Sequence, residues 1–187
     1  MALNKWMIAE GGLELLAKGG LENLSIRKLA DHFGIKSASL YYHFRNKQQL
    51  LDHVADVMVR PAWREVRDDE SWDEWLPDVA FRLRRQILAF PDGALLYAGA
   101  SPPADLLDER LALLYAPFLK AGMSREVVRR VILTFIRFTI GWATDEQVAD
   151  DRGVGREAGV SDIDFEFGLR TIVLGVKALL DQSRPSS

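Results

Sequence analysis

The spacing of apolar residues restricts this chain to helical folds. Apolar side chains recur every three or four residues through almost the whole sequence, as Leu50, Val54, Val57 and Met58 do. That spacing places them on one face of an α-helix. We find no convincing run in which apolar and polar residues alternate, the pattern of a half-buried β-strand. We therefore predict an all-α protein.

Composition excludes several classes of site and location. The chain has no cysteine, which removes disulfides, thiol catalysis and zinc–thiolate sites. Lys5, Glu10 and Glu14 interrupt the first twenty residues, so we expect no signal peptide. No uncharged apolar run approaches the roughly 18 residues of a membrane helix. We expect a cytoplasmic protein with no membrane segment.

Charge is distributed unevenly along the chain. The net charge is −3, but residues 1–60 carry a net +2 and residues 61–187 a net −5. Asp31 is the only acidic residue between positions 25 and 50, a segment that holds five cations: Arg27, Lys28, Lys36, Arg45 and Lys47. An acidic body with one basic patch suits a protein that contacts a polyanion through a small surface.

Capping signals divide the N-terminal part into short helices. Asn4 is the expected N-cap of a first helix that stops at Gly19–Gly20. Ser25 starts a short second helix that ends at Gly34, and a third is expected from Ser37 to Arg45. Asn46, with Gln49 completing a capping box, starts a longer helix that breaks near Pro61.

The remaining sequence predicts further helices joined by polar segments. We expect helices at 71–90, 94–100, 101–121, 125–148 and 165–181. Pro77 should delay or kink the first of these. Residues 64–70 read as a charged, solvated hinge that includes Asp68, Asp69 and Glu70, and residues 149–162 as a loop. The segment 125–148 is apolar on more than one face, which predicts burial on several sides.

Two short helices joined by Gly34–Lys36 form the pattern of a helix-turn-helix. The residues expected to be buried are Ile26, Leu29, Phe33, Leu40 and Phe44, which leaves Ser37, Ser39, Tyr41, Tyr42 and His43 to point elsewhere. Hydroxyl groups suit phosphate oxygens and groove edges, and Arg27 can make a bidentate contact to guanine. Lys47 adds charge to a helix N-terminus that already favours phosphate. On spacing alone, an ordinary helical corner explains the pattern as well as a DNA-binding surface does.

The segment "LSIRKLADHFGIKSASLYYHFRNKQQLL" resembles the DNA-binding segment of the tetracycline repressor family of bacterial regulators. The stretches "PDGALLYAGASPP", "FTIGWATDEQ" and "FEFGLRTIVLGV" are similar to parts of that family's ligand-binding half. The resemblance implies an N-terminal three-helix helix-turn-helix domain (1–46), a connecting helix (47–66) and a C-terminal ligand-binding and dimerisation domain (67–187). It also implies a homodimer through 125–148 and 165–181.

The resemblance further implies roles for individual residues on a double-stranded DNA operator. Five residues would face bases: Arg27, Ser37, Ala38, Tyr42 and His43. Four would face the DNA backbone: Ile26, Ser39, Tyr41 and Lys47. A hydroxyl contact of the family is lost at Ile26, and Ser37–Ala38 replaces a Gln–Pro pair, so we expect a different operator sequence.

The ligand positions implied by the family are less polar here. They fall on Trp63, Val79, Leu83, Tyr97, Ala100 and Leu113, and Asp145 keeps a carboxylate that lies near a metal in tetracycline-binding members. Tyr97 replaces the histidine that holds their magnesium–drug chelate, and neutral tyrosine is a poor magnesium ligand. We expect no cofactor or metal, and an apolar or aromatic small-molecule effector.

Other readings of single residues and of function are also open. The sequence lacks HExxH, GxSxG and Gly-rich phosphate loops, so we expect no enzyme. A ligand-responsive protein that acts through protein contacts, without DNA, is the rival interpretation. His32 and His53 read as exposed helix residues. The acidic group Asp145, Glu146, Asp150 and Asp151 reads as a solvated helix end more than as a cation site.

Overall fold

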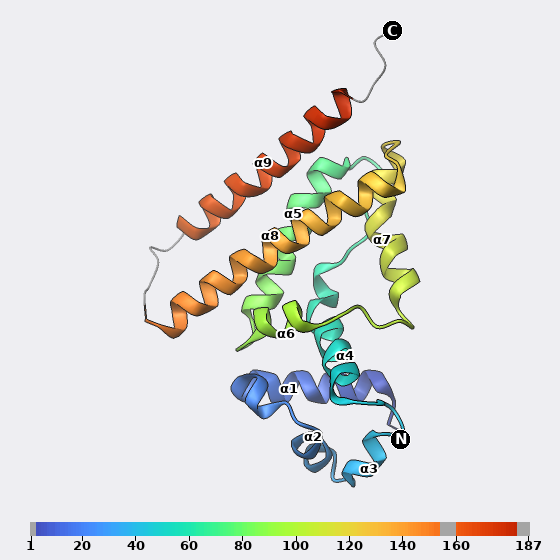
Figure 1. The fold of residues 1–187 in the computed structure, drawn as a ribbon, viewed down its shortest axis with the longest axis vertical. Helices are drawn as coiled ribbons and strands as arrows, with labels where there is room; N and C mark the ends of the chain where they lie inside the picture. Colours follow the sequence, from blue (N-terminus) through green and yellow to red (C-terminus); the bar gives the residue numbers. More distant parts are fainter. Residues whose placement is uncertain (1–2, 154–159, 183–187) are drawn as a thin grey trace.

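The computed structural model describes residues 3–153 and 160–182, and within these ranges it contains helices and connections but no strand. This confirms the all-α prediction (Figure 1). The elements are α1 (Lys5–Asn23), α2 (Ile26–Phe33), α3 (Ser37–Leu40), α4 (Lys47–Val59), the 3-10 turn η1 (Arg60–Ala62), α5 (Trp72–Leu88), α6 (Gly93–Gly99), α7 (Leu107–Lys120), α8 (Arg125–Asp151) and α9 (Val160–Gln182). No helix in these ranges is both long and apolar enough to cross a bilayer.

Helices α1 to α3 form a unit at one end of the molecule, from which α4 runs toward the other helices (Figure 1). The side chains of Asn4, Ser25 and Asn46 each accept a hydrogen bond from the backbone N–H three residues later, as predicted. Glycine allows α1 to pack closely on its neighbours. A Cβ at Gly11 would lie 2.5 Å from the Phe33 ring, and one at Gly12 would lie 2.7 Å from Val54.

The expected stop of the first helix at Gly19–Gly20 is a kink, after which α1 continues to Asn23. The Asp92 carboxylate, from the turn between α5 and α6, accepts a hydrogen bond of 2.8 Å from the Leu21 backbone N–H at this kink. Gly20 has φ of 63°, and any Cβ there would overlap the Asp92 carboxylate. Gly20 therefore leaves room for the Asp92 carboxylate, whose hydrogen bond to Leu21 links the N-terminal unit to the helices that follow.

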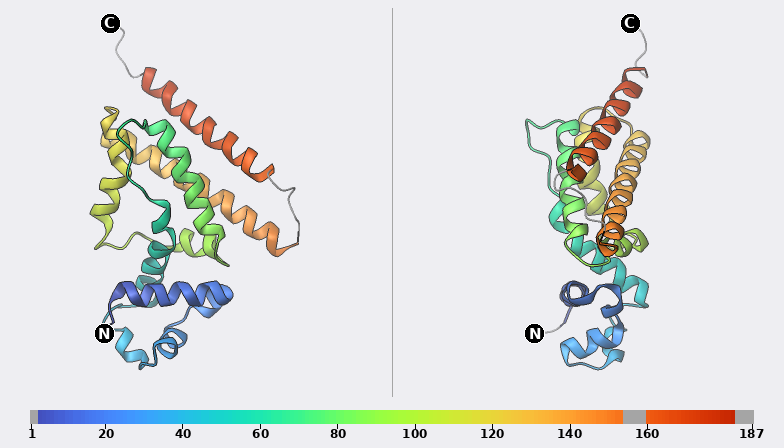
Figure 2. Two further views of the ribbon diagram at one scale, coloured as in Figure 1. Left: turned by 180° about the vertical axis from the view of Figure 1, so that it is seen from behind. Right: turned by 90° about the vertical axis from the view of Figure 1, so that its left-hand side faces the viewer.

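The larger body packs α5 against α8, with α6 and α7 beside α8 and α9 on the outside (Figure 2). Trp75, Phe118, Phe135 and Phe165 are fully buried in its core. Helix α5 begins at Trp72 and runs through Pro77, so of the two expected effects, a late start or a kink, the late start does not occur. The Ser71–Glu74 capping box fixes the first turn, where Ser71 N donates to Glu74 Oε2 at 2.9 Å.

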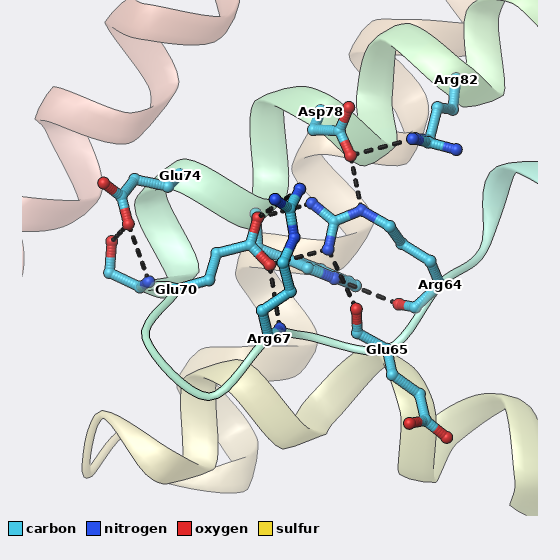
Figure 3. A network of polar contacts seen from close by, with 9 residues as sticks. Arg64, Glu65, Arg67, Glu70, Glu74, Asp78 and Arg82 are labelled. Carbon is cyan, nitrogen blue, oxygen red and sulfur yellow. Dashed lines mark hydrogen bonds and ion pairs between the residues drawn. The ribbon is translucent and has the colours of Figure 1, made fainter.

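Residues 64–70 are held by an ion-pair network and are not the solvated hinge expected from the sequence (Figure 3). Arg64 makes two hydrogen bonds to the Glu70 carboxylate, at 2.5 and 2.7 Å, and a third to Asp78 at 2.6 Å. Trp75 Nε1 donates to the Arg64 carbonyl at 3.1 Å. Hydrogen bonds from Arg64 lower the pKa of Glu70 to about 2. Asp68 and Asp69 are exposed, as expected.

Two other boundaries differ from the prediction. Helix α7 begins at Leu107 and not at the Ser101–Pro103 signal, because a residue before proline avoids the helical conformation. Helix α8 extends to Asp151 and α9 begins at Val160, so both ends of the expected 149–162 loop are helical. Its central residues, 154–159, lie outside the described ranges.

A buried arginine connects α5, α8 and α9. Arg84 makes hydrogen bonds of 2.7 and 2.6 Å to the Glu146 carboxylate and one of 2.5 Å to Asp162. Glu146 is 7% exposed, so the expectation of a solvated helix end is wrong for this residue. The sequence pattern around Glu146 could not predict its partner, because Arg84 lies 62 positions away.

Candidate nucleic-acid interface and internal cavity

The turn between α2 and α3 has the geometry that its sequence predicts. Gly34 adopts a left-handed conformation, with φ of 64°. The Ile35 N–H donates to the Ala30 carbonyl at 3.0 Å and the Gly34 N–H to the Asp31 carbonyl at 3.1 Å, which is a Schellman ending of α2. The chain therefore reverses within three residues and α3 follows directly.

Helix α3 is shorter than predicted, ending at Leu40 and continuing as a turn over residues 41–43. Asn46 must be extended to cap α4, so the chain has to leave the helix before it. Leu40 and Phe44 are buried, whereas Tyr41 is 55% and Tyr42 90% exposed. The neighbouring Tyr41 and Tyr42 therefore expose their rings to solvent. The buried Leu40 before them and Phe44 after them anchor the segment.

The nine residues assigned to DNA contact, including the half-buried Ile26, all lie on α2, α3, the following turn and the first turn of α4. Arg27, Ala38 and Lys47 are exposed, and Ser37, Ser39 and His43 are half-buried. Within the described chain, no acidic side chain pairs with Arg27 or Lys47. The surface is therefore positively charged, and it lies at the end of the molecule opposite α9 (Figure 1).

His53 is buried, at 6% exposure, although the sequence suggested an exposed residue. Its Nδ1 lies 2.8 Å from the Gln49 carbonyl, and its ring meets Phe44 edge-on at 5.1 Å between centroids. Its Nε2 lies 3.5 Å from the carboxylate of Asp105. His32 is exposed on α2, as expected.

Polar contacts join α1 and α4 to residues 99–105, which comprise the last residue of α6 and most of the connection to α7. Gln48 donates to the Gly99 carbonyl at 2.9 Å, and Asp52 accepts from the Ser101 N–H at 3.0 Å. Lys5 on α1 donates to Asp105 at 2.9 Å. A movement of this segment would therefore be transmitted to α1 and α4.

A cavity of about 330 Å³ that opens to solvent lies beside the same segment, bordered by α4, α6, α7 and α8. Three of the predicted ligand residues line it: Trp63, Tyr97 and Ala100. Leu113 lines a neighbouring opening of about 610 Å³ between α7 and residues 60–66, which Trp63 also borders. Val79 and Leu83 are fully buried core residues of α5 and line neither space. A volume of this size suits a small organic ligand.

Comparisons with known proteins match both the helix-turn-helix segment and the helices around the cavity. Residues 8–54 match the family model "Bacterial regulatory proteins, tetR family", and residues 66–161 match "Tetracyclin repressor-like, C-terminal domain". The chain is similar to tetracycline repressor protein class C of Escherichia coli, with 34% identity over 158 residues, which are 81% of this chain and 71% of that protein. The chain belongs to the tetracycline repressor family.

Solved structures of the family share the whole fold. A TetR variant from Acinetobacter baumannii AYE, in complex with minocycline, has a TM-score of 0.83 at 26% identity over 95% of this chain and 98% of that one. BioQ with its natural double-stranded DNA operator has a TM-score of 0.72 at 29% identity over 94% and 98%. The chain is accordingly a helix-turn-helix transcriptional regulator and not an enzyme.

This member of the tetracycline repressor family has charged residues in its cavity that the sequence analysis missed. Asp56, Arg110 and Arg137 line it, and the Asp56 carboxylate forms an ion pair with Arg110. The ligand positions were expected from the sequence to be less polar than those of the family, and this ion pair was not among the expected features. An acid within the apolar run Val54–Val59 was the available signal, but its arginine lies 54 residues further along the chain.

Burial controls ionisation in this cavity. It raises the pKa of Asp56, and the nearby Arg110 and Arg60 oppose that rise. Burial also raises the pKa of Tyr97 well above its ordinary value, so the phenol stays neutral. In the described chain, no three His, Asp or Glu side chains are grouped as metal ligands would be, and Asp145 is exposed on α8.

Proposed function

We propose that this protein is a repressor that is released from a near-palindromic DNA operator by a small-molecule effector, and that it acts in the cytoplasm. Relatives of known structure bind an operator and a drug, which supports this role. The exposed Tyr41–Tyr42 pair is the observation that carries the proposal, because large apolar rings are rarely left in water without a partner.

The proposed interface divides its residues by role. Arg27, Ser37, Ala38, Tyr42 and His43 contact base edges in the major groove. Ser39, Tyr41 and Lys47 contact phosphates, which position the helix without reading sequence. In the proposed complex Ile26 packs against the DNA backbone, at a position where the family has a hydroxyl group.

The proposed dimer forms through α8 and α9. Three large apolar side chains of α9, Ile163, Phe167 and Leu174, are between 63% and 74% exposed. They are spaced at four and seven residues and so share one face of the helix. A second subunit covering this face would hold two DNA-binding units about one helical turn apart, ~34 Å. In this assignment the DNA-binding domain is 1–46, the connecting helix 47–66 and the regulatory domain 67–187.

The proposed effector site is the 330 Å³ cavity. Its lining residues do not fit a magnesium chelate, because Tyr97 is a neutral phenol and no carboxylate cluster is present in the described chain. Calorimetry should therefore detect no magnesium-dependent binding of tetracycline. Tight binding that required magnesium would contradict this assignment.

Substitutions in the proposed interface test the DNA-binding role. Tyr41→Ala and Lys47→Ala should weaken binding about equally on all sequences, since both remove backbone contacts. Arg27→Ala should cost about 1–3 kcal/mol on the operator and relax the preference at one base pair. Fluorescence anisotropy with DNA from upstream of the protein's own gene, at several salt concentrations, measures both effects. Unchanged affinity in all three variants would contradict the proposal.

A further inference from the structure

The cavity lining combines aliphatic side chains with a cluster of polar ones. The aliphatic residues come from α4, α7 and α8: Ala55, Val59, Leu114, Leu133, Ile136 and Ile140. The polar end is the cluster of Asp56 on α4, Trp63 after η1, and Arg110 on α7. The Arg110 guanidinium carbon lies 5.4 Å from the centroid of the Trp63 ring, and the same group pairs with Asp56. The three polar residues are therefore neighbours.

Two atoms at the polar end have no hydrogen-bond partner within the described chain. One is Asp56 Oδ2, an acceptor on a side chain that is 8% exposed, and the other is Trp63 Nε1, a donor. Leaving a buried polar atom unpaired destabilises the folded protein, so such atoms call for an explanation. Elsewhere in the chain, Trp75 and Trp142 donate from Nε1 to an oxygen, at 3.1 and 3.2 Å.

The charge of Asp56 is already paired near these atoms. Arg110 neutralises Asp56, and Asp52 Oδ1 accepts from Ser101 and Gln48. Arg137, which is exposed on α8, lines the cavity among the aliphatic residues of that helix. Tyr97 adds a neutral hydroxyl. A full charge on the ligand at the polar end would lack a counter-charge there and would lose its hydration.

We infer that the effector is an uncharged, mainly apolar aromatic molecule bearing a hydroxyl group, whose O–H donates to Asp56 Oδ2 and whose oxygen accepts from Trp63 Nε1. A hydroxyl supplies donor and acceptor from one atom, which matches two unpaired atoms of opposite character. The inference rests on the cavity being the effector site, and it adds the chemical class that the cavity selects.

The experiment compares 2-naphthol with 2-methoxynaphthalene by isothermal titration calorimetry on the full chain. The methoxy compound keeps the ring system and the acceptor oxygen but has no donor. The wild-type protein should bind 2-naphthol at least about tenfold more tightly, the effect of one buried hydrogen bond to a charged acceptor. Equal affinity for the two compounds, or no binding of 2-naphthol, would overturn the inference.

A matched pair of variants tests the donor. Trp63→Phe removes the indole N–H, which makes no hydrogen bond in the ligand-free protein, so folding should survive; thermal unfolding checks this. The Trp63→Phe variant should bind 2-naphthol about fivefold more weakly. The Trp6→Phe variant, which removes an indole on α1, should bind it as the wild type does. An equal effect of both variants would contradict the assignment. Operator release is scored separately: 2-naphthol bound with this preference but leaving DNA affinity unchanged would refute the regulatory proposal and leave the site chemistry intact.

Discussion

Single residues show where local sequence determines structure and where it does not. Ser25, Gly34 and Asn46 act on their own backbone or on residues three positions away, and their roles were predictable. Glu70 and His53 were predicted to be exposed. These predictions were wrong because tertiary packing, which the local sequence does not reveal, supplies their partners. The Asp56–Arg110 pair was missed for the same reason, whereas the exposed Tyr42 followed from a local pattern.

Glu70 should make stability depend on acid. Its folded pKa of about 2 lies below the ordinary 4.5, so its contribution is complete above pH 4.5 and is lost as pH falls toward 2. Glu70→Gln should lower the unfolding free energy by about 1–2 kcal/mol at pH 7. The difference from wild type should shrink between pH 4.5 and 2 in urea titrations.

The exposed Asp69, in the same connection, provides the control. Asp69→Asn should leave stability near that of the wild type at both pH values. A Glu70→Gln deficit that stayed constant down to pH 2 would show that the network contributes through shape and not through charge.

At the scale of elements, boundaries were predictable where a cap lies next to the helix. Ser71 and Ser124 are the N-caps of α5 and α8, which start at or next to the predicted positions 71 and 125. The predicted start of α7 was wrong because prolines occupy the expected first turn, and α8 runs past its predicted end at Val148 to Asp151. Helix α9 exposes large apolar side chains to solvent, so substitutions on this helix test the proposed dimer.

Leu174→Glu should shift the protein from dimer to monomer in analytical ultracentrifugation, because it introduces a charge into the proposed apolar interface. Operator affinity should fall with it, since two half-sites would no longer be held together. Leu95 on α6 is equally exposed, at 63%, and lies outside α8 and α9. Leu95→Glu should leave the dimer intact; a wild-type dimer that both variants preserved would place the interface elsewhere.

At the scale of the whole molecule, the cavity and the DNA-binding unit share one segment. The segment 99–105 contributes residues to the cavity lining and is hydrogen-bonded to Gln48 and Asp52 on α4 and to Lys5 on α1. A ligand that displaces this segment would alter the separation of two DNA-binding units in a dimer. Typical coupling of about 1–3 kcal/mol would change operator affinity roughly 5- to 150-fold.

The most direct test of the account is selection of binding sites from randomised duplex DNA by the purified protein. We predict enrichment of a near-palindrome whose half-sites are centred about ten base pairs apart, as two α3 segments in successive major grooves require. The Tyr42→Ala variant should lose this enrichment while remaining folded. Recovery of no preferred sequence, or of a single half-site without symmetry, would contradict the account.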